Sequence, residues 1–455
     1  MNDITAFFAF LKYCLGYKEN MSRVIAGMNW HELYSFASKQ ALLGLCFEGI
    51  ERLGEEYPEE LKRNPIGREL LMTWMGKAQQ IRRQNMKVNA VASKLFSMLR
   101  VDGMRCCILK GQGNALMYPN PYSRTPGDID VWIDASRERI MEYAQKKFEL
   151  EDDIRLQHLE TSLDGVPVEL HFFPCSMNNP IYHARLQKWF RRNADLQCSH
   201  IVGLPDGAGD IAIPTTAFNV IYQLTHLYHH FFDEGIGMRQ IIDYFLVVND
   251  FSKNVFLNND LSNHPVNFSN HPVPLSKEGS TFSPSPSSSG SGDVTAPSRC
   301  SEPLRSKDGG PSKVSPDCAG WDRLAIEGDN SATAVTSSAS TALVVVQREL
   351  KCLGLWKFAG AVMYVLHEAL GLPEEKMIAP MDEKRGKLLL AEILNGGNFG
   401  QHFTKYGHFT QQEMAKKYFL KIWRNMHFVR YYPAEALSEP IFRTWHFFWR
   451  FKHRR

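Results

Sequence analysis

Two strand-like runs, residues 155–163 and 166–172, are separated only by Asp164 and Gly165, and this spacing constrains the fold more than any other feature of the sequence. An Asp-Gly pair between two such runs predicts a β-hairpin with a two-residue loop. The length of the loop also fixes which residues of the two strands lie opposite each other. The chain is therefore expected to contain a sheet, although much of its remaining length has the apolar spacing of helices.

The register of this hairpin gathers charged side chains on one face. Glu160 lies opposite Glu169 and His158 lies opposite His171. Two directly opposed carboxylates repel each other unless a cation, a proton or solvent separates them. Glu169 has apolar neighbours on both sides in its strand, so we expect it to be the carboxylate that lies near a metal ion.

Further strands are predicted before the hairpin. Residues 104–109 form a short, mostly apolar run suited to a buried strand, and residues 128–134 alternate between polar and apolar side chains. Asp102 and Gly103 end the preceding helix and turn the chain toward the first of these strands. Because the polar helical segment 137–148 lies between strands, the pattern predicts a small mixed sheet with helices packed against it.

The chain divides into five segments by pattern and composition. Residues 1–100 form a helical N-terminal lobe, residues 101–200 an α/β (α+β) core, and residues 201–250 helices that pack on the core. Residues 251–341 are rich in Ser, Pro, Asn and Gly and have too little apolar surface to offset the entropy of ordering, so we expect a long disordered insertion. Helical periodicity returns in residues 342–455, a C-terminal lobe that ends in a basic aromatic tail.

Composition and charge exclude several classes of protein. The 455 residues are 44% hydrophobic and 22% charged, as in ordinary globular proteins, and the 52 basic residues against 49 acidic ones exclude a strongly polybasic scaffold for nucleic acid. The nine cysteines contain no CxxC pair, which argues against a structural zinc or a disulfide framework. The apolar runs are shorter than the roughly 20 residues of a membrane span, and no signal-peptide pattern begins the chain, so we expect a cytoplasmic protein without a transmembrane segment.

A glycine turn and three carboxylates converge on one edge of the predicted sheet. Asp128 and Asp130 share one face of their strand, with Cα atoms about 6.6 Å apart. Gly111 and Gly113 follow the preceding strand and allow the backbone to approach a phosphate closely. Together with Glu169, this set suits nucleotidyl transfer with two Mg²⁺ ions, which neutralise the triphosphate and lower the pKa of the attacking hydroxyl.

The same motifs resemble those of the polymerase-β-like nucleotidyltransferase superfamily, and they are most similar to its bacterial uncharacterised nucleotidyltransferase family. In that family the matching motifs recur in the order Leu109-Lys110-Gly111, Arg124, Asp128-Ile129-Asp130, Glu169-Leu170-His171 and Thr225-His226-Leu227-Tyr228-His229-His230. The resemblance covers about residues 1–250 and 342–430 and implies a nucleotidyltransferase core fold.

The resemblance implies an enzyme that moves NMP from an NTP to an acceptor and releases pyrophosphate, with Mg²⁺ or Mn²⁺ as cofactor. It assigns the catalytic and metal-binding roles to Asp128, Asp130 and Glu169. Nucleotide binding is expected of Lys110, Gly111, Gly113 and Arg124, and substrate contact of His158, His171, His226 and His230. The preferred base and the acceptor, whether a protein, an RNA, a small molecule or a glycan precursor, stay open.

Other interpretations stay open as well. The same fold could persist as a nucleotide- or partner-binding module without turnover. His226 and His230 are four residues apart, a spacing that also suits a metal ion, although no third ligand is evident. Asp134 is expected to cap the helix that begins at residue 137. The basic aromatic tail, residues 441–455, either packs on the helical bundle or contacts an anionic membrane or a nucleic acid.

Overall fold

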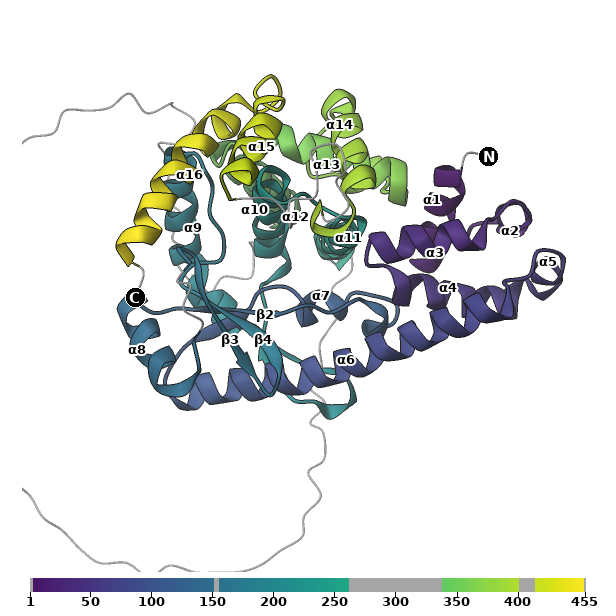
Figure 1. Ribbon diagram of the computed structural model, residues 1–455, viewed down its shortest axis with the longest axis horizontal. Helices are drawn as coiled ribbons and strands as arrows, with labels where there is room; N and C mark the ends of the chain where they lie inside the picture. The colour runs from purple at the N-terminus through teal and green to yellow at the C-terminus, as the bar shows by residue number, and fades with distance from the viewer. Residues whose placement is uncertain (1–2, 151–154, 262–337, 401–413, 454–455) are drawn as a thin grey trace, which may run out of the picture. The chain divides into compact units, whose positions relative to one another are not determined.

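The computed structural model describes residues 3–150, 155–261, 338–400 and 414–453. Contacts between residues group the chain into one compact unit of residues 1–259 and 333–455 and a second unit of residues 260–332. The elements that position the candidate site belong to the first unit, in which helices surround one small sheet (Figure 1).

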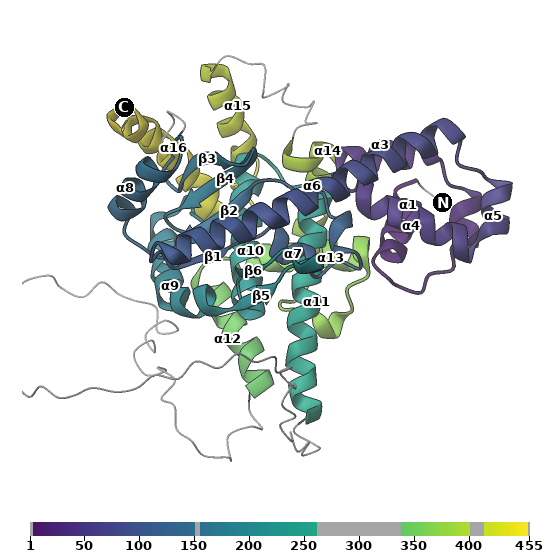
Figure 2. The ribbon, with the colours of Figure 1, turned by 90° about the horizontal axis from the view of Figure 1, so that it is seen from below.

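The first hundred residues are helical, as the sequence predicts. The helices are α1 (Asp3–Cys14), α2 (Ser22–Ala26), α3 (Trp30–Lys39), α4 (Leu43–Glu56), α5 (Pro58–Arg63) and α6 (Arg68–Val101). The 34-residue α6 contributes to two apolar cores. Its first half buries Leu70 and Trp74 among helices, whereas its second half buries Leu95 and Leu99 against the sheet. Figures 1 and 2 show α6 running from the N-terminal helices across the sheet.

The main sheet has four strands in the order β1-β2-β4-β3. These strands are β1 (Cys106–Ile108), β2 (Ile129–Ile133), β3 (His158–Leu163) and β4 (Val166–His171). Strand β2 runs antiparallel to β1 and parallel to β4, and β3 pairs antiparallel with β4. The predicted small mixed sheet is therefore confirmed. A separate two-stranded sheet consists of β5 (Ile201–Gly203) and β6 (Asp210–Ala212).

The β3–β4 hairpin has the predicted register. Glu160 is paired with Glu169, and His158 is paired with His171. The two residues of the loop have φ angles of 50° and 70°. Two-residue loops of type I′ require positive φ at both positions, which Asp and Gly adopt at low cost. The local sequence of the loop thus sets which side chains face each other across the ribbon.

The helices around the sheet are α7 (Gln112–Ala115), α8 (Arg137–Lys147), α9 (Pro180–Ser199), α10 (Thr216–Asp233) and α11 (Met238–Leu261). The expected cap of α8 by Asp134 is wrong. The Ser136 side chain accepts a hydrogen bond from the Arg139 backbone N–H, because Ser136 directly precedes the helix in an extended conformation. The Asp134 carboxylate instead pairs with the Arg105 guanidinium.

The borders of the predicted insertion are corrected on both sides. Helix α11 continues to Leu261, because Phe251 is buried in the core and Val255 packs against it. Helix α12 begins at Ser338 rather than at residue 342. The remainder of the predicted insertion, residues 262–337, lies outside the described residues.

The return of helices after the insertion is confirmed. These helices are α12 (Ser338–Cys352), α13 (Trp356–Leu370), α14 (Glu383–Gly396), α15 (Met414–Met426) and α16 (Pro433–His453). Helix α16 presents an apolar outer face, on which Ile441 is 73% exposed, Trp445 49% and Phe448 66%. Over the described part of the chain, no helix combines the length and apolar character needed to cross a membrane.

Candidate active site

The predicted carboxylates meet on two neighbouring strands. Asp130 of β2 is paired with Glu169 of β4 in the parallel ladder. Alternation along the strand places Asp128, just before β2, on the same side as Asp130. Asp130 is 5% exposed, whereas Asp128 lies open to solvent. The structure thus brings together three carboxylates from two strands that lie far apart in the sequence.

His171 links the buried Asp130 to the partly buried Glu169. Its Nε2 atom lies 3.1 Å from Asp130 Oδ1 and 3.1 Å from Glu169 Oε2. Burial would lower the pKa of His171, but the hydrogen bonds to Asp130 and Glu169 outweigh burial and raise it to about 9. His171 is therefore an imidazolium at neutral pH, and its positive charge offsets part of the repulsion between the carboxylates.

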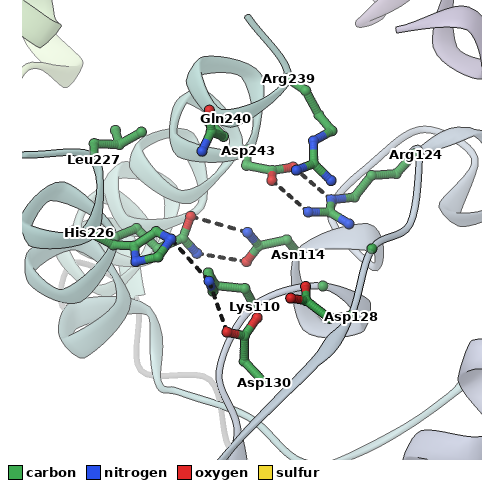
Figure 3. A pocket seen from close by; sticks show the side chains of 13 residues that line it. Lys110, Asn114, Arg124, Asp128, Asp130, His226, Leu227, Arg239, Gln240 and Asp243 are labelled. Atoms are coloured by element: carbon green, nitrogen blue, oxygen red, sulfur yellow. Dashed lines mark hydrogen bonds and ion pairs between the residues drawn. The ribbon is translucent and has the colours of Figure 1, made fainter. Parts of the chain in front are cut away.

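Lys110 reaches the same carboxylates from the end of β1. Its Nζ atom lies 3.1 Å from Asp130 Oδ1 and 3.0 Å from His226 Nε2 (Figure 3). Burial would raise the pKa of Asp130, but Lys110 and His171 outweigh it and hold this pKa well below its usual range. Asp130 therefore stays ionised at neutral pH.

Asp128 has the opposite electrostatic character. The negative charge of Asp130, followed by desolvation, raises the pKa of Asp128 to about 6. Figure 3 shows its carboxylate turned toward Lys110 and Asp130. The cations of the protein therefore compensate only part of the negative charge of Asp128, Asp130 and Glu169.

The predicted glycine turn lies beside the carboxylates. Gly111 has a φ of 52°, in the region that favours glycine, and directly precedes α7. At Gly113, a Cβ atom would lie 3.0 Å from the side chain of Ile213, so the backbone packs closely there. The helix that follows the turn is a single turn of four residues.

A cavity of about 50 Å³, which we name cavity A, lies between the carboxylates and helices α10 and α11 (Figure 3). Its lining includes the carboxylates Asp128 and Asp130 and the basic residues Lys110, Arg124 and Arg239. Acidic and basic side chains therefore share one cavity.

Arg124 lies in the wall of cavity A within a buried ion pair. Its Nε and Nη2 atoms donate to the two carboxylate oxygens of Asp243, each at 2.8 Å. Burial would raise the pKa of Asp243, but the Arg124 guanidinium outweighs burial and lowers it. Arg239 donates from Nη1 to the Thr125 carbonyl oxygen at 3.0 Å. Both guanidinium groups are thus held in place by the protein.

The predicted histidines form two groups. His226 Nε2 lies 2.9 Å from His230 Nε2 on α10. His158 lies beside His171, with ring centroids 5.0 Å apart, and its Nδ1 is 3.3 Å from Glu169 Oε2. Within the described ranges, the group of three with the geometry to hold a metal ion is His158, Glu169 and His171, whose ligand atoms lie within 4.8 Å of one another. This set differs from the His226–His230 pair considered from spacing alone.

The donor atoms at this edge fit a divalent cation. Asp128, Asp130 and Glu169 supply the anionic oxygens that Mg²⁺ and Mn²⁺ prefer. The raised pKa of Asp128 reports a repulsion between carboxylates that a cation would relieve. The three carboxylates are the residues that would hold such an ion.

Sequence reasoning missed the amide pair that ties the glycine turn to α10. Asn114 donates to Gln223 Oε1 at 3.1 Å, and Gln223 donates to Asn114 Oδ1 at 2.7 Å. Both side chains are buried. A polar residue among the apolar positions of α10 was the available signal, but its partner lies 109 residues away.

A family model covers the segment that carries these residues. A family described as uncharacterised nucleotidyltransferase matches residues 26–262, which is just over half of the chain and includes all three carboxylates. Neither the curated proteins nor the solved structures contain a match to this chain. The chain therefore belongs to the uncharacterised nucleotidyltransferase family, as the motif resemblance predicts.

Proposed function

We propose that the protein is a divalent-metal-dependent nucleotidyltransferase that moves NMP from an NTP to an acceptor. The observation that carries this proposal is the pairing of Asp130 with Glu169 on parallel strands, with Asp128 beside them at the mouth of cavity A. Three carboxylates on one sheet edge next to basic side chains suit the binding of a cation and a triphosphate together.

The transfer itself is a displacement at the α-phosphorus. The acceptor oxygen forms a bond to this phosphorus, the bond to the bridging oxygen breaks, and pyrophosphate leaves with the electron pair. Mg²⁺ or Mn²⁺, held by Asp128, Asp130 and Glu169, would neutralise charge on the phosphates. Lys110 and Arg124 would contact phosphate oxygens in cavity A.

Asp130 and Glu169 are better suited to hold a cation than to take a proton. Lys110 and His171 hold the pKa of Asp130 well below its usual range in spite of burial. For Glu169, burial is likewise outweighed by the hydrogen bond from His171, which lowers the pKa. Weak bases of this kind stay ionised, which favours ion binding over deprotonation of the acceptor.

A second candidate function is a nucleotide-binding module without turnover. The pairing of Arg124 with Asp243 and of Lys110 with Asp130 favours it, because these cations already have partners within the protein. Nucleotide binding without release of pyrophosphate would distinguish this candidate from an enzyme.

The test is incubation of the full chain with each α-phosphate-labelled NTP, Mg²⁺ and a cell extract as the source of acceptor. We expect the wild type to transfer label and Asp128→Asn to transfer none. Binding of nucleotide by both proteins with no transfer by either would support the binding module instead.

A further inference from the structure

A second cavity, cavity B, lies beside the carboxylates at the edge of the sheet. Asp130 of β2 is paired with Glu169 of β4, and the Nδ1 atom of His158 on β3 lies 3.3 Å from Glu169 Oε2. Asp130 lines cavity A, and His158 lines cavity B. Cavity B has a volume of about 190 Å³, and its walls come from the start of β3, the segment before α9, and helices α10 and α16. Glu169 therefore stands between the two cavities.

Polar atoms in the wall of cavity B are buried and unsatisfied. His229 Nδ1 and Glu439 Oε2 have no hydrogen-bond partner among the described residues. The ring nitrogens of His158 also make no hydrogen bond there, although they lie 3.5 Å from Glu160 Oε1 and 3.3 Å from Glu169 Oε2. His158 is 9% exposed and Glu439 is 1% exposed. Leaving such groups unpaired costs about 1–3 kcal/mol each. A ligand with hydrogen-bonding groups would remove this cost.

The hydrogen-bonding capacity of these atoms indicates which kind of ligand fits cavity B. A carboxylate oxygen such as Glu439 Oε2 only accepts hydrogen bonds, whereas a neutral imidazole has one donor and one acceptor nitrogen. Burial lowers the pKa of His229 to about 4, so this ring is neutral at pH 7. Hydroxyl groups donate and accept, and therefore match this mixture.

The charges around cavity B are already matched within the protein. Arg443 contacts Asp233 at 2.9 Å and also pairs with Glu439, while Arg155 contacts Glu160 at 2.6 Å. A strongly charged ligand would have to break these pairs. Cavity B is thus suited to a ligand without net charge.

We propose that cavity B binds the acceptor of the transfer, and that this acceptor is a small, neutral, polyhydroxylated molecule whose reacting hydroxyl lies against His158. This inference rests on the proposed function. His158 Nδ1 lies 3.3 Å from Glu169 Oε2, so a hydroxyl held there is next to the carboxylate set.

The proposed transfer exchanges one bond at the α-phosphorus for another. The acceptor hydroxyl oxygen forms the bond to the α-phosphorus, and pyrophosphate leaves with the electrons of the bond that breaks. The hydroxyl proton passes to solvent water. The products are the NMP ester of the acceptor and pyrophosphate.

The first experiment identifies the acceptor class with the full-length protein, α-phosphate-labelled NTP, Mg²⁺ and the small-molecule fraction of a cell extract. Periodate, which cleaves vicinal diols, is used to treat a second portion of the extract and is then quenched. We expect a labelled product with the untreated extract and its loss after periodate treatment. Protease or nuclease treatment of the extract should leave the product unchanged.

A matched pair of variants then tests the cavity. Ser176 lines cavity B and is buried, so Ser176→Phe fills it, whereas Ser162→Phe makes the same change at an exposed position of β3. Ser176→Phe should lose transfer to the acceptor but keep nucleotide binding and slow hydrolysis of NTP to NMP. Ser162→Phe should behave as the wild type. Should Ser176→Phe not fold, Glu439→Gln should raise the KM for the acceptor at unchanged kcat.

Binding is also measured without turnover, by saturation-transfer NMR with myo-inositol and methyl glucoside as probes. We expect signals with the wild type and none with Ser176→Phe. A periodate-resistant acceptor, or equal transfer by the two phenylalanine variants, overturns the assignment of cavity B and leaves the proposed function intact. Sugar binding without transfer to any acceptor or to water overturns the proposed function and leaves cavity B as a binding site. Neither binding nor transfer overturns both.

Discussion

Cavities A and B differ in how their polar groups are satisfied. In cavity A, Lys110 pairs with Asp130, and Arg124 pairs with Asp243. In cavity B, His158 and Glu439 carry buried atoms without hydrogen-bond partners in the described part of the chain. Cavity A is therefore pre-organised by its own charges, whereas polar atoms of cavity B are left for a ligand or solvent to satisfy. The predictions below test this difference.

The largest effect is expected from Asp128→Asn. Removing this carboxylate should reduce nucleotidyl transfer by at least about 10²–10³-fold. Because the pKa of Asp128 is raised to about 6, its charge is unfavourable in the folded protein above that pH, and the free energy of unfolding at pH 7 should stay equal or rise. Transfer is measured with labelled NTP, and stability by urea unfolding.

Asp134→Asn is the matched control for this variant. Asp134 follows the other end of β2 and pairs with Arg105 outside cavity A. Its replacement should leave transfer unchanged. Full transfer by Asp128→Asn would contradict the role of the carboxylate set.

The next effect concerns the charge pairing in cavity A. Arg124→Ala leaves the buried Asp243 carboxylate without its bidentate partner, which should lower the free energy of unfolding by about 3–5 kcal/mol. The exposed pair of Lys94 with Asp164 provides the comparison, and Lys94→Ala should cost less than about 1 kcal/mol. Equal urea midpoints for the two variants would show that cavity A does not depend on its internal ion pair.

A third prediction follows from His171. Its pKa is raised from 6.5 to about 9, so its contribution to stability is fully present below pH 6.5 and is lost as the pH rises through 9. The loss should be on the order of 3 kcal/mol. Urea unfolding between pH 6 and about 10 measures this loss of stability. The free energy of unfolding of His171→Gln should not show the same fall with pH. Parallel profiles for the two proteins would argue against an imidazolium between the carboxylates.

The smallest effect on stability is expected at the outer face of α16, whose inner face lines cavity B through Glu439 and Phe442. Trp445→Ser with Phe448→Ser should change the free energy of unfolding by no more than about 0.5 kcal/mol, because both side chains are exposed. The sequence leaves open that this segment contacts an anionic membrane, and the double variant tests that interpretation.

The double variant should therefore lose binding to vesicles that contain phosphatidylserine, in a sedimentation assay. Neutral phosphatidylcholine vesicles serve as the control, and binding by the wild type should fall steeply with salt. If the double variant also lost sugar binding, the outer face and cavity B would not be independent.

Features set by neighbouring residues could be predicted from the sequence. Asp164 and Gly165 determine a loop of two residues, and from the loop follows the pairing of Glu160 with Glu169. The short strands and the helices on both sides follow from hydrophobic periodicity. The end of α11 was predicted too early, because its polar residues after Phe251 hide the contact of Val255 with the core.

Features that join distant parts of the chain could not be predicted. The contact of Lys110 with His226 spans 116 residues, and the pair of Arg124 with Asp243 spans 119. His171 was expected to contact a substrate, but its position between two carboxylates depends on the parallel pairing of β2 with β4. Such contacts depend on how the helices dock on the sheet, which periodicity does not encode.

The strand order also bears on how this protein can diversify. Asp130 and Glu169 lie on the inner strands β2 and β4, each flanked by neighbours on both sides, whereas the wall of cavity B begins on the edge strand β3 and the loop before it. An edge strand tolerates changes in length and sequence better than an inner one, because fewer hydrogen bonds depend on it. With cavity B as the proposed acceptor site, changes in β3 would alter which acceptor binds and would leave the carboxylates on the inner strands in place.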